Sequence, residues 1–383
     1  MAIPISSPSP RLDRFGQAME SLYGSFSSIE NPAEWTPPPR SGGHRGRYLW
    51  TDAFGVINFL TMHSEYKRSG NDKIGDDRYL VLADRLVETV HGILGRKRDG
   101  RSRLRGATDA NPLAGGLRIG KTDPHGPDGD GQYHHYLTVW MFALNRMTRA
   151  SGDMKYNRQA IELAKAIHPK FFVDRSAARP RMVWKMNMDL TEPMVKSEGN
   201  LDPIDGYVIF RLLQATAIEA GDGAVLTEEI DDYKRTMQRK GEHFVSSDPL
   251  DLGMTLWTVH WFSERENWAA DLADNLFEIN RYLERNIKFR LAFREFGTCM
   301  GIQCQSEVNA EKESSVDLKC YSDAIIAAWD PYMELTISDD LTPVDLRPIT
   351  RVMYASALIP GVLSTPAFRA GFLGQEPTTS LEK

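Results

Sequence analysis

The sequence predicts an all-α fold, a double ring of helical hairpins around a central cavity, the (α/α)6 toroid. Apolar segments alternate along the chain with amphipathic, highly charged segments. A helix that is apolar on all sides is buried, whereas one with a charged face lies at the surface, so the alternation predicts two concentric rings. Strand signals are confined to Arg181–Met188 and Ile287–Phe293. An open α-solenoid is the alternative, and the many aromatic residues of the apolar segments favour the closed ring.

The elements follow in order along the chain. Residues 1–47 hold one candidate helix, Arg11–Phe26, and then a Pro- and Gly-rich strap of the kind that wraps over a surface. Six apolar helices are expected at Leu49–Met62, Gln132–Met147, Ile204–Ala220, Leu252–Phe262, Asp323–Leu335 and Arg351–Leu363. Four amphipathic helices are expected at Asp77–Gly95, Met154–Phe172, Thr227–Phe244 and Asn267–Asn286. We expect one barrel domain over residues 48–373, with residues 1–47 packed on it and 374–383 as a C-terminal tail.

Composition and charge exclude several classes of function. The net charge of −6 gives no reason to expect a nucleic-acid or membrane partner. No segment approaches the ~18 uncharged apolar residues of a transmembrane helix, and the N-terminal residues lack the apolar core of a secretory signal. Three cysteines cannot all pair within one chain, which favours a reducing compartment. We therefore expect a cytoplasmic protein that acts on a small molecule.

Four aspartates share one setting, in which a turn, an aspartate and an apolar helix rich in aromatic residues follow one another. Asp205 and Asp251 are close copies, 46 residues apart (251 − 205), a spacing typical of helical repeats. In a closed ring their carboxylates would gather at one mouth, where two can act as general acid and general base. Asp52 and Asp323 are expected to hold substrate hydroxyls. The alternative for each is a helix cap.

Two further aspartates, Asp202 and Asp248, lie three residues before Asp205 and Asp251. Each is followed by proline, a pair that more often initiates a turn. Glu198, shortly before the third apolar helix, is a further candidate for the same rim, with a solvent-facing turn as its alternative.

Adjacent histidines, His134 and His135, lead into the second apolar helix. Neighbouring side chains on a helix point about 100° apart, so one of the two is expected to face inward. A histidine at the mouth of a cavity suits proton transfer near neutral pH. The alternatives are a polar cap or a packed imidazole. A metal site is not expected, because the neighbouring ligands that would complete it are not evident.

Aromatic residues near the helix starts are candidates for stacking on a sugar ring or lining a pocket. Trp50, Tyr133 and Tyr207 lie closest to predicted helix starts, and Trp257 lies further along an apolar helix. Core packing is the alternative for each. The methionines of Arg181–Met188 would suit an apolar ligand at least as well as a sugar.

The segment 95–131 is a long predicted loop that begins with a run of arginines. Within it, Gly115–Thr122 satisfies the phosphate-loop pattern G-x4-G-K-[ST]. That pattern binds phosphate only between a buried strand and a helix. Here the preceding residues do not form a strand, and Asp123-Pro124 cannot start the helix, so a Gly-rich lid is the better interpretation.

The layout resembles the six-hairpin glycosidase superfamily and the related N-acylglucosamine 2-epimerase-type barrels. The resemblance covers roughly Tyr48 to Leu373 and rests on the alternating helices and the aromatic inner helices, without a family-specific catalytic motif. It implies an enzyme that acts on a sugar or glycoside, as hydrolase or epimerase, without a cofactor. By analogy with the epimerases it also makes His134 and His135 candidates for proton transfer. The alternatives are a cyclase or isomerase of a hydrophobic metabolite, such as a terpenoid or polyketide, and a non-enzymatic binding scaffold.

Overall fold

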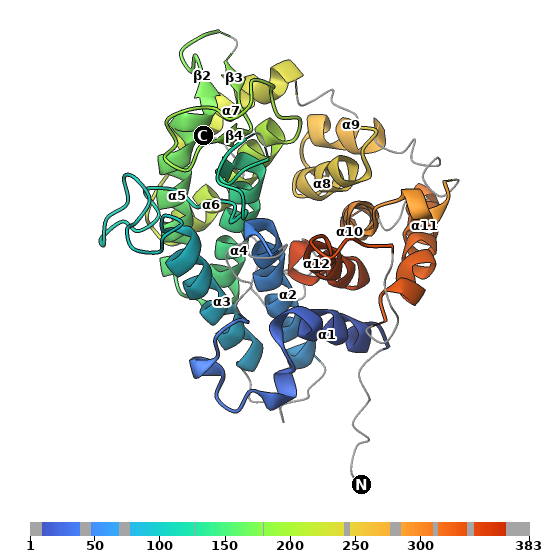
Figure 1. Cartoon of the computed structure of the whole chain (residues 1–383). Helices are drawn as coiled ribbons and strands as arrows, with labels where there is room; N and C mark the ends of the chain where they lie inside the picture. Colours follow the sequence, from blue (N-terminus) through green and yellow to red (C-terminus); the bar gives the residue numbers. More distant parts are fainter. Residues whose placement is uncertain are drawn as a thin grey trace.

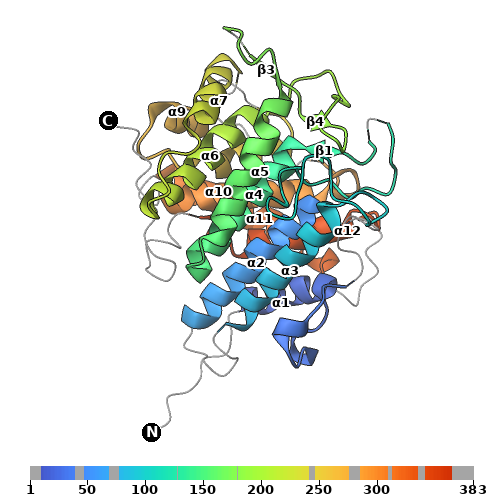
Figure 2. The same ribbon diagram turned by 90° about the vertical axis from the view of Figure 1, so that its left-hand side faces the viewer.

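The computed structural model describes residues 10–38, 47–68, 77–126, 128–178, 180–240, 246–275, 285–308, 313–334 and 341–364. Within these ranges the protein is predominantly helical, as predicted, and its strands form two short antiparallel pairs. Figures 1 and 2 show the helices arranged as two concentric layers. In this part of the chain no helix is both long enough and apolar enough to cross a membrane.

Six helices form the inner ring: α2 (Leu49–Arg68), α4 (His134–Ser151), α6 (Asp202–Glu219), α8 (Pro249–Val259), α10 (Ala292–Val308) and α12 (Arg347–Leu358). The outer helices are α1 (Pro10–Tyr23), α3 (Arg78–Leu94), α5 (Lys155–Phe171), α7 (Thr227–Lys240), α9 (Asn267–Asn275) and α11 (Glu313–Trp329). Each inner helix packs against the next, and α12 packs against α2. The ring is therefore closed, which excludes the open solenoid.

A buried polar contact joins the last inner helix to the first. The amide of Asn58 on α2 donates a hydrogen bond to the Val352 carbonyl oxygen on α12 (3.1 Å), and the hydroxyl of Ser356 donates to Asn58 (2.9 Å). Asn58 and Ser356 are both fully buried. Buried polar groups need internal partners. These hydrogen bonds therefore fix how α2 and α12 are aligned where the ring closes.

Helices α8 and α10 approach each other through glycines. A Cβ atom on Gly253 would lie 2.1 Å from the carbonyl oxygen of Gly297, and one on Gly301 would lie 2.1 Å from the carbonyl oxygen of Gly253. The absence of side chains at these positions lets the two backbones come into direct contact.

The fifth hairpin differs from the prediction. Asp323–Leu335 was expected to be an inner helix, but its helical part belongs to the outer helix α11, and residues 335–340 lie outside the described ranges. The inner position is taken by α10, which begins within the predicted strand Ile287–Phe293. The sequence of α10 contains two glycines and two glutamines, which interrupt its apolar pattern and make its burial hard to recognise from the sequence.

Helix α1 forms where Arg11–Phe26 predicted a helix, and it packs along α12 as the outer partner of the sixth hairpin. Its arginines reach the neighbouring hairpin, where Arg14 pairs with Asp330. The hydroxyl of Tyr354 on α12 donates to the same aspartate (2.6 Å). The chain therefore uses one of its first elements to complete the last hairpin.

The predicted strand Arg181–Met188 is confirmed in two pieces. β3 (Arg181–Met182) pairs with β2 (Phe172–Val173), and β4 (Lys185–Met186) pairs with β1 (Gln132–Tyr133). Because β1 runs directly into α4, this pairing fixes the position of the first residues of α4.

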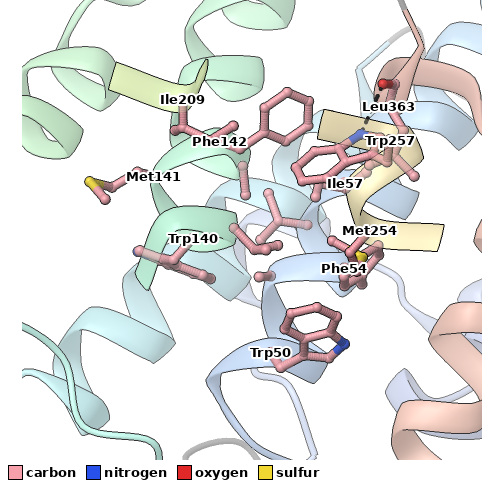
Figure 3. Packing of buried hydrophobic residues seen from close by; sticks show 14 of the residues in the cluster. Trp50, Phe54, Ile57, Trp140, Met141, Phe142, Ile209, Met254, Trp257 and Leu363 are labelled. Carbon is pink, nitrogen blue, oxygen red and sulfur yellow. Dashed lines mark hydrogen bonds between the residues drawn. The ribbon is translucent and has the colours of Figure 1, made fainter. Parts of the chain in front are cut away.

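Large apolar side chains fill the space between the inner helices (Figure 3). Phe142 and Trp257 are fully buried and meet edge to face, with ring centroids 4.9 Å apart. The indole nitrogen of Trp257 donates to the Leu363 carbonyl oxygen (3.2 Å). This packing supports the helix ends where the polar residues gather.

Candidate active site

The starts of α2, α4 and α6 meet around the imidazole of His135. This ring lies 4.5 Å from the ring of Trp50 on α2, centroid to centroid, and its Nδ1 hydrogen-bonds the carboxylate of Asp205 on α6. All three side chains are buried. The structure thus brings together three of the residues that the sequence singled out.

A second hydrogen bond fixes the carboxylate of Asp205. Its Oδ1 accepts from the hydroxyl of Thr258 on α8 (3.0 Å), so three consecutive inner helices are joined at this point. Burial alone would lower the pKa of His135, but the carboxylates of Asp205, Asp202 and Asp251 outweigh burial and raise it. The carboxylate of Asp205 therefore favours the charged form of the imidazole. Among the described residues, Nε2 of His135 and Nε1 of Trp50 are buried without a hydrogen-bond partner.

His134 faces the opposite way from His135, as expected for adjacent residues on a helix. Its Nδ1 lies 3.2 Å from a carboxylate oxygen of Asp202, and its Nε2 lies 2.7 Å from the hydroxyl of Tyr233 on the outer helix α7. The ring of Tyr233 occupies the space beside Gly206, where an added Cβ would lie 2.2 Å from it. A glycine inside α6 thus admits an outer-ring side chain to the site.

Asp251 lies in the first turn of α8 and is half-buried. The cap of this helix is Asp248, whose carboxylate accepts from the backbone amides of Leu250 (2.9 Å) and Asp251 (3.3 Å). Asp251 itself accepts from the hydroxyl of Ser246 (3.3 Å). Burial raises the pKa of Asp251, and the charge of Asp248 raises it further. Asp248 therefore caps α8, and the Asp251 carboxyl keeps its proton to a higher pH than an ordinary aspartate does.

Aromatic rings surround the start of α4. Tyr133 stacks on Tyr136 with ring centroids 4.6 Å apart, and it lies 4.9 Å from the ring of Trp184. Trp50 lies 5.3 Å from Tyr136. Burial and the charges of Asp202, Asp251 and Asp205 raise the pKa of Tyr133, so its phenol stays neutral. Trp50 therefore packs on the His135 ring, and Tyr133 lies within the electrostatic influence of the aspartates.

Asp52 and Asp323, expected to hold substrate hydroxyls, have protein partners. Asp52 is fully buried and accepts from Nε of Arg47 (2.9 Å) and from the hydroxyl of Tyr23 (3.0 Å). Asp323 lies on the outer helix α11 and forms a half-exposed ion pair with Arg11 of α1 (2.7 Å). The structure does not bring either carboxylate to the His135 cluster, and the expected inner-helix start at Asp323 was wrong.

Three further candidates also point elsewhere. Tyr207 packs edge-on against Trp268 of α9, with centroids 5.8 Å apart. Trp257 lies in the packed interior described above. Glu198 pairs with Arg239 of α7 (2.7 Å). For Tyr207 and Trp257 the core-packing alternative fits these contacts.

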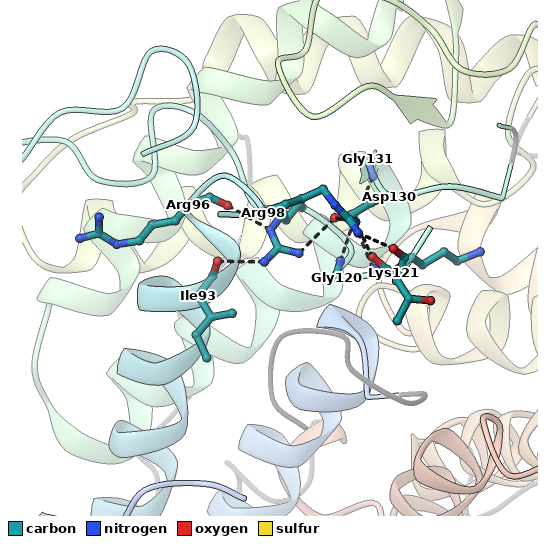
Figure 4. Close-up of polar contacts among 9 residues, drawn as sticks. Ile93, Arg96, Arg98, Gly120, Lys121, Asp130 and Gly131 are labelled. Atoms are coloured by element: carbon teal, nitrogen blue, oxygen red, sulfur yellow. Dashed lines mark hydrogen bonds and ion pairs between the residues drawn. The ribbon is translucent and has the colours of Figure 1, made fainter. Parts of the chain in front are cut away.

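The phosphate-loop pattern is occupied by a carboxylate of the chain itself (Figure 4). Oδ1 of Asp130 accepts from the backbone amides of Gly120 (2.8 Å), Lys121 (3.2 Å) and Gly131 (3.1 Å). Its Oδ2 accepts from Arg98 (3.1 Å) and Arg118 (3.0 Å). No helix directly follows the Gly115–Thr122 pattern among the described residues, so the local structure differs from that of a phosphate loop. The network instead holds the chain that enters β1 and α4.

Sequence reasoning missed Tyr233 and Thr258. Tyr233 lies on an amphipathic outer helix, where a tyrosine carries no sign of contact with the inner ring. Thr258 lies near the end of α8, away from the helix starts. One signal was available: Gly206 interrupts an otherwise apolar helix, and such a glycine often marks a close approach by a neighbour.

The described residues contain no group of three or more His, Cys, Asp or Glu side chains arranged to hold a metal ion. The side chains gathered at this cluster carry carboxyl, imidazole and phenol groups. The buried carboxylate of Asp205 is bonded to the imidazole of His135, whose pKa is raised, and the charge of Asp251, a carboxyl with a raised pKa, acts on the same imidazole.

The chain is similar to known proteins in its three-dimensional structure and not in its sequence. No protein-family model matches the chain, and its sequence matches no curated protein. The structure is similar to that of a family 76 glycoside hydrolase from a bovine Bacteroides thetaiotaomicron strain, with a TM-score of 0.54 and 12% identity, over 91% of this chain and 77% of that one. A second similar structure is a family 76 glycoside hydrolase (mannosidase) from Bacteroides thetaiotaomicron VPI-5482, with a TM-score of 0.53 and 13% identity, over 91% of this chain and 98% of that one. At these identities the likeness shows the shared fold.

Proposed function

We propose that this chain is a glycoside hydrolase in which Asp251 and Asp205 carry out the acid–base chemistry. One observation carries the proposal: the two carboxyl groups act on the same buried imidazole, yet their surroundings differ. Asp205 is ion-paired to His135, whereas burial raises the pKa of Asp251. Two neighbouring carboxyl groups in such different electrostatic surroundings are typical of a general acid paired with a general base. The glycoside hydrolases with a similar fold support the same class of reaction.

The proposed reaction assigns a proton donor and a proton acceptor. Asp251, in its protonated form, donates its proton to the glycosidic oxygen as the bond to the anomeric carbon breaks. Asp205, as the carboxylate, accepts a proton from the water whose oxygen bonds to that carbon. His135 orients Asp205 and balances its charge, and Thr258 fixes the second carboxylate oxygen. The products are two sugars, and each carboxyl group regains its starting state by exchange with solvent.

The aromatic residues at the mouth suit a sugar ring. The faces of Tyr133 and Trp184 can pack on the apolar face of a pyranose. The unpartnered Nε1 of Trp50 and Nε2 of His135 are donors that a substrate hydroxyl would satisfy. His134 does not act on substrate in this proposal, because Asp202 and Tyr233 already engage both of its ring nitrogens.

The experiment measures release of reducing sugar by purified wild type, Asp251→Asn and Asp205→Asn. Mannosides come first in the panel, because one similar structure is that of a mannosidase. Loss of a general acid or base costs about 10²–10⁴-fold in rate. An aryl glycoside with an acidic phenol needs no protonation of its leaving group, so it should restore much of the rate of Asp251→Asn and none of that of Asp205→Asn.

The control is Asp222→Asn, which removes an exposed carboxylate that pairs with Arg158 on the surface. It should leave turnover unchanged. Wild-type rates in folded Asp251→Asn or Asp205→Asn protein would refute the assignment. Absence of hydrolysis across the panel, with ligand binding retained, would favour the binding-scaffold alternative. Neither comparison supports the epimerase, cyclase or isomerase alternatives.

A further inference from the structure

A pocket of about 400 Å³ lies beside the first turn of α8. It is formed by the residues before α8, by the segment that leads into α10, and by the first turn of α10. The lining residues that matter here are Asp248, Arg285, Phe289, Arg290, Arg294 and Glu295. None of them donates or accepts a proton in the proposed cleavage.

Two electrostatic links connect this pocket to the proposed catalytic residues. Asp248 lies in the pocket wall, and its charge contributes to the raised pKa of Asp251. On the other side, burial raises the pKa of Tyr136 to about 12, and the charge of Arg294 opposes that rise. Tyr136 packs on Trp50, 5.3 Å between ring centroids. The backbone amide of Asp251 also donates to the carboxylate of Asp248 (3.3 Å), so the pocket wall directly contacts the residue proposed as the acid.

The charges of the pocket do not balance. Arg290 binds Glu295 through two hydrogen bonds (2.7 and 2.5 Å), and Arg294 pairs with Asp248. The third guanidinium, that of Arg285, is exposed and forms no ion pair with the residues that the structure describes. Three arginines thus face two carboxylates, which leaves one positive charge available to a ligand.

An aromatic ring lies at the same pocket. Phe289 is 83% exposed, which is unusual for a large apolar side chain. An exposed aromatic face next to a guanidinium offers both parts of a site for a charged sugar. The ring packs on the apolar face of the pyranose, and the guanidinium binds a carboxylate or phosphate in a charge-assisted pair.

We propose that this pocket is a subsite for an anionic sugar unit, one that carries a carboxylate or a phosphate. The inference rests on the proposed function, because it makes the substrate an acidic glycoside with its charged unit next to the bond that is cleaved. Arg285 and Phe289 determine this specificity by binding. Asp251 and Asp205 remain the residues that act on the bond.

The test measures binding and needs no turnover. Calorimetric titrations of the full chain use mannose, mannose 6-phosphate and mannuronate, with inorganic phosphate as the probe that lacks a sugar ring. The two anionic sugars should bind about tenfold more tightly than mannose, a difference of about 1.4 kcal/mol. Because the excess is electrostatic, it should shrink as salt is added. The phosphate and carboxylate arms show which anion the pocket prefers.

Variants separate charge from stacking. Arg285→Ala should remove the preference for the anionic sugars and leave mannose binding unchanged, while Phe289→Ala should weaken all three sugars alike. Arg265→Ala, which removes an exposed arginine outside the pocket, is the matched control. Equal affinities for mannose and the anionic sugars, no binding of the anionic sugars, or an intact preference in Arg285→Ala would each overturn the subsite. Failure of hydrolysis alone would count only against the proposed function, since this readout is binding.

Discussion

The hydroxyl of Tyr233 lies 2.7 Å from Nε2 of His134, although Tyr233 belongs to the outer ring and His134 begins an inner helix. The other nitrogen of the imidazole lies 3.2 Å from Asp202. A residue of the outer ring thus holds a histidine that in turn faces a carboxylate of the site. Two histidines that are neighbours in sequence have different tasks: His135 engages Asp205, and His134 joins α4 to the outer ring.

Replacing Tyr233 by phenylalanine removes one buried hydrogen bond and little volume. Because His134 would keep a buried nitrogen without its partner, we expect a loss of about 1–3 kcal/mol in the free energy of unfolding. Urea unfolding followed by circular dichroism measures it. Tyr332→Phe, at a half-buried position on a distant hairpin, is the control. An unchanged midpoint for Tyr233→Phe would show that the 2.7 Å contact contributes nothing to stability.

Replacing Gly253 by alanine tests the close approach of α8 and α10. The new methyl group would lie 2.1 Å from the Gly297 carbonyl oxygen, so the helices must separate. Overpacking of this kind costs about 1–3 kcal/mol. Gly16→Ala is the matched control, because that glycine also lies inside a helix but an added Cβ meets nothing within 4 Å. The unfolding temperature should therefore fall for Gly253→Ala and rise for Gly16→Ala. Equal shifts would contradict the close contact between α8 and α10.

The raised pKa of Asp251 gives the proposed hydrolysis a pH dependence of defined sign. A raised pKa keeps the carboxyl protonated to a higher pH than an ordinary aspartate, and only the protonated form donates. Activity should therefore be retained above the usual range for an aspartate and fall as pH rises through the raised value. The pH profile of kcat/KM measures this limb. On an aryl glycoside with an acidic phenol the limb should be weakened, and an identical limb on both substrates would argue against Asp251 as the acid.

Replacing Asp52 by asparagine should affect stability and leave the chemistry intact. The side chains of Asp52 and Arg47 are 0% and 1% exposed, so the change leaves a buried guanidinium without its counter-ion. Breaking a buried pair in this way costs about 3–5 kcal/mol. Chemical unfolding measures the loss, and kcat per folded molecule should match wild type. A large rise in KM with wild-type stability would instead restore the role in substrate binding that the sequence suggested.

Replacing Asp323 by alanine should have little effect on either property. Its ion pair with Arg11 is nearly half-exposed, and such pairs contribute at most about 1 kcal/mol. We expect an unchanged KM and a shift in the unfolding midpoint close to the error of the measurement. A KM raised several-fold would show that the outer helix α11 contributes to binding after all.

The ring architecture could be predicted because the sequence of a helix shows whether that helix is buried. A helix such as α6 is apolar on nearly every side, and α5 carries a charged face. The same reasoning gave a wrong prediction for the inner helix of the fifth hairpin. α10 buries polar residues such as Glu295 and Gln303, so it is not apolar on all sides. Glu295 is bonded by Arg290, and Gln303 donates to Ser322 and to the Ala357 carbonyl oxygen.

The candidate site was predictable in part. A turn, an aspartate and an apolar helix located Asp205 and Asp251, but the same pattern located Asp52, which bonds to Arg47 and Tyr23. Asp52 and Asp205 differ in the residue that binds each carboxylate. Those partners lie 5 and 70 residues away in the chain. Local sequence patterns describe a residue's setting in its own helix, whereas the pKa of a group depends on its neighbours in space.

The pairing of α1 with α12 has a consequence for how the protein is made. Helix α1 ends at Tyr23 and α12 begins at Arg347, so α1 leaves the ribosome long before its partner exists. Synthesis proceeds from the N-terminus, and contacts between distant parts of a chain form slowly. Through most of translation the apolar face of α1 has no completed hairpin to join. The nascent chain therefore stays an open arc until the final helix arrives, and a polypeptide truncated before α12 would be exposed to aggregation.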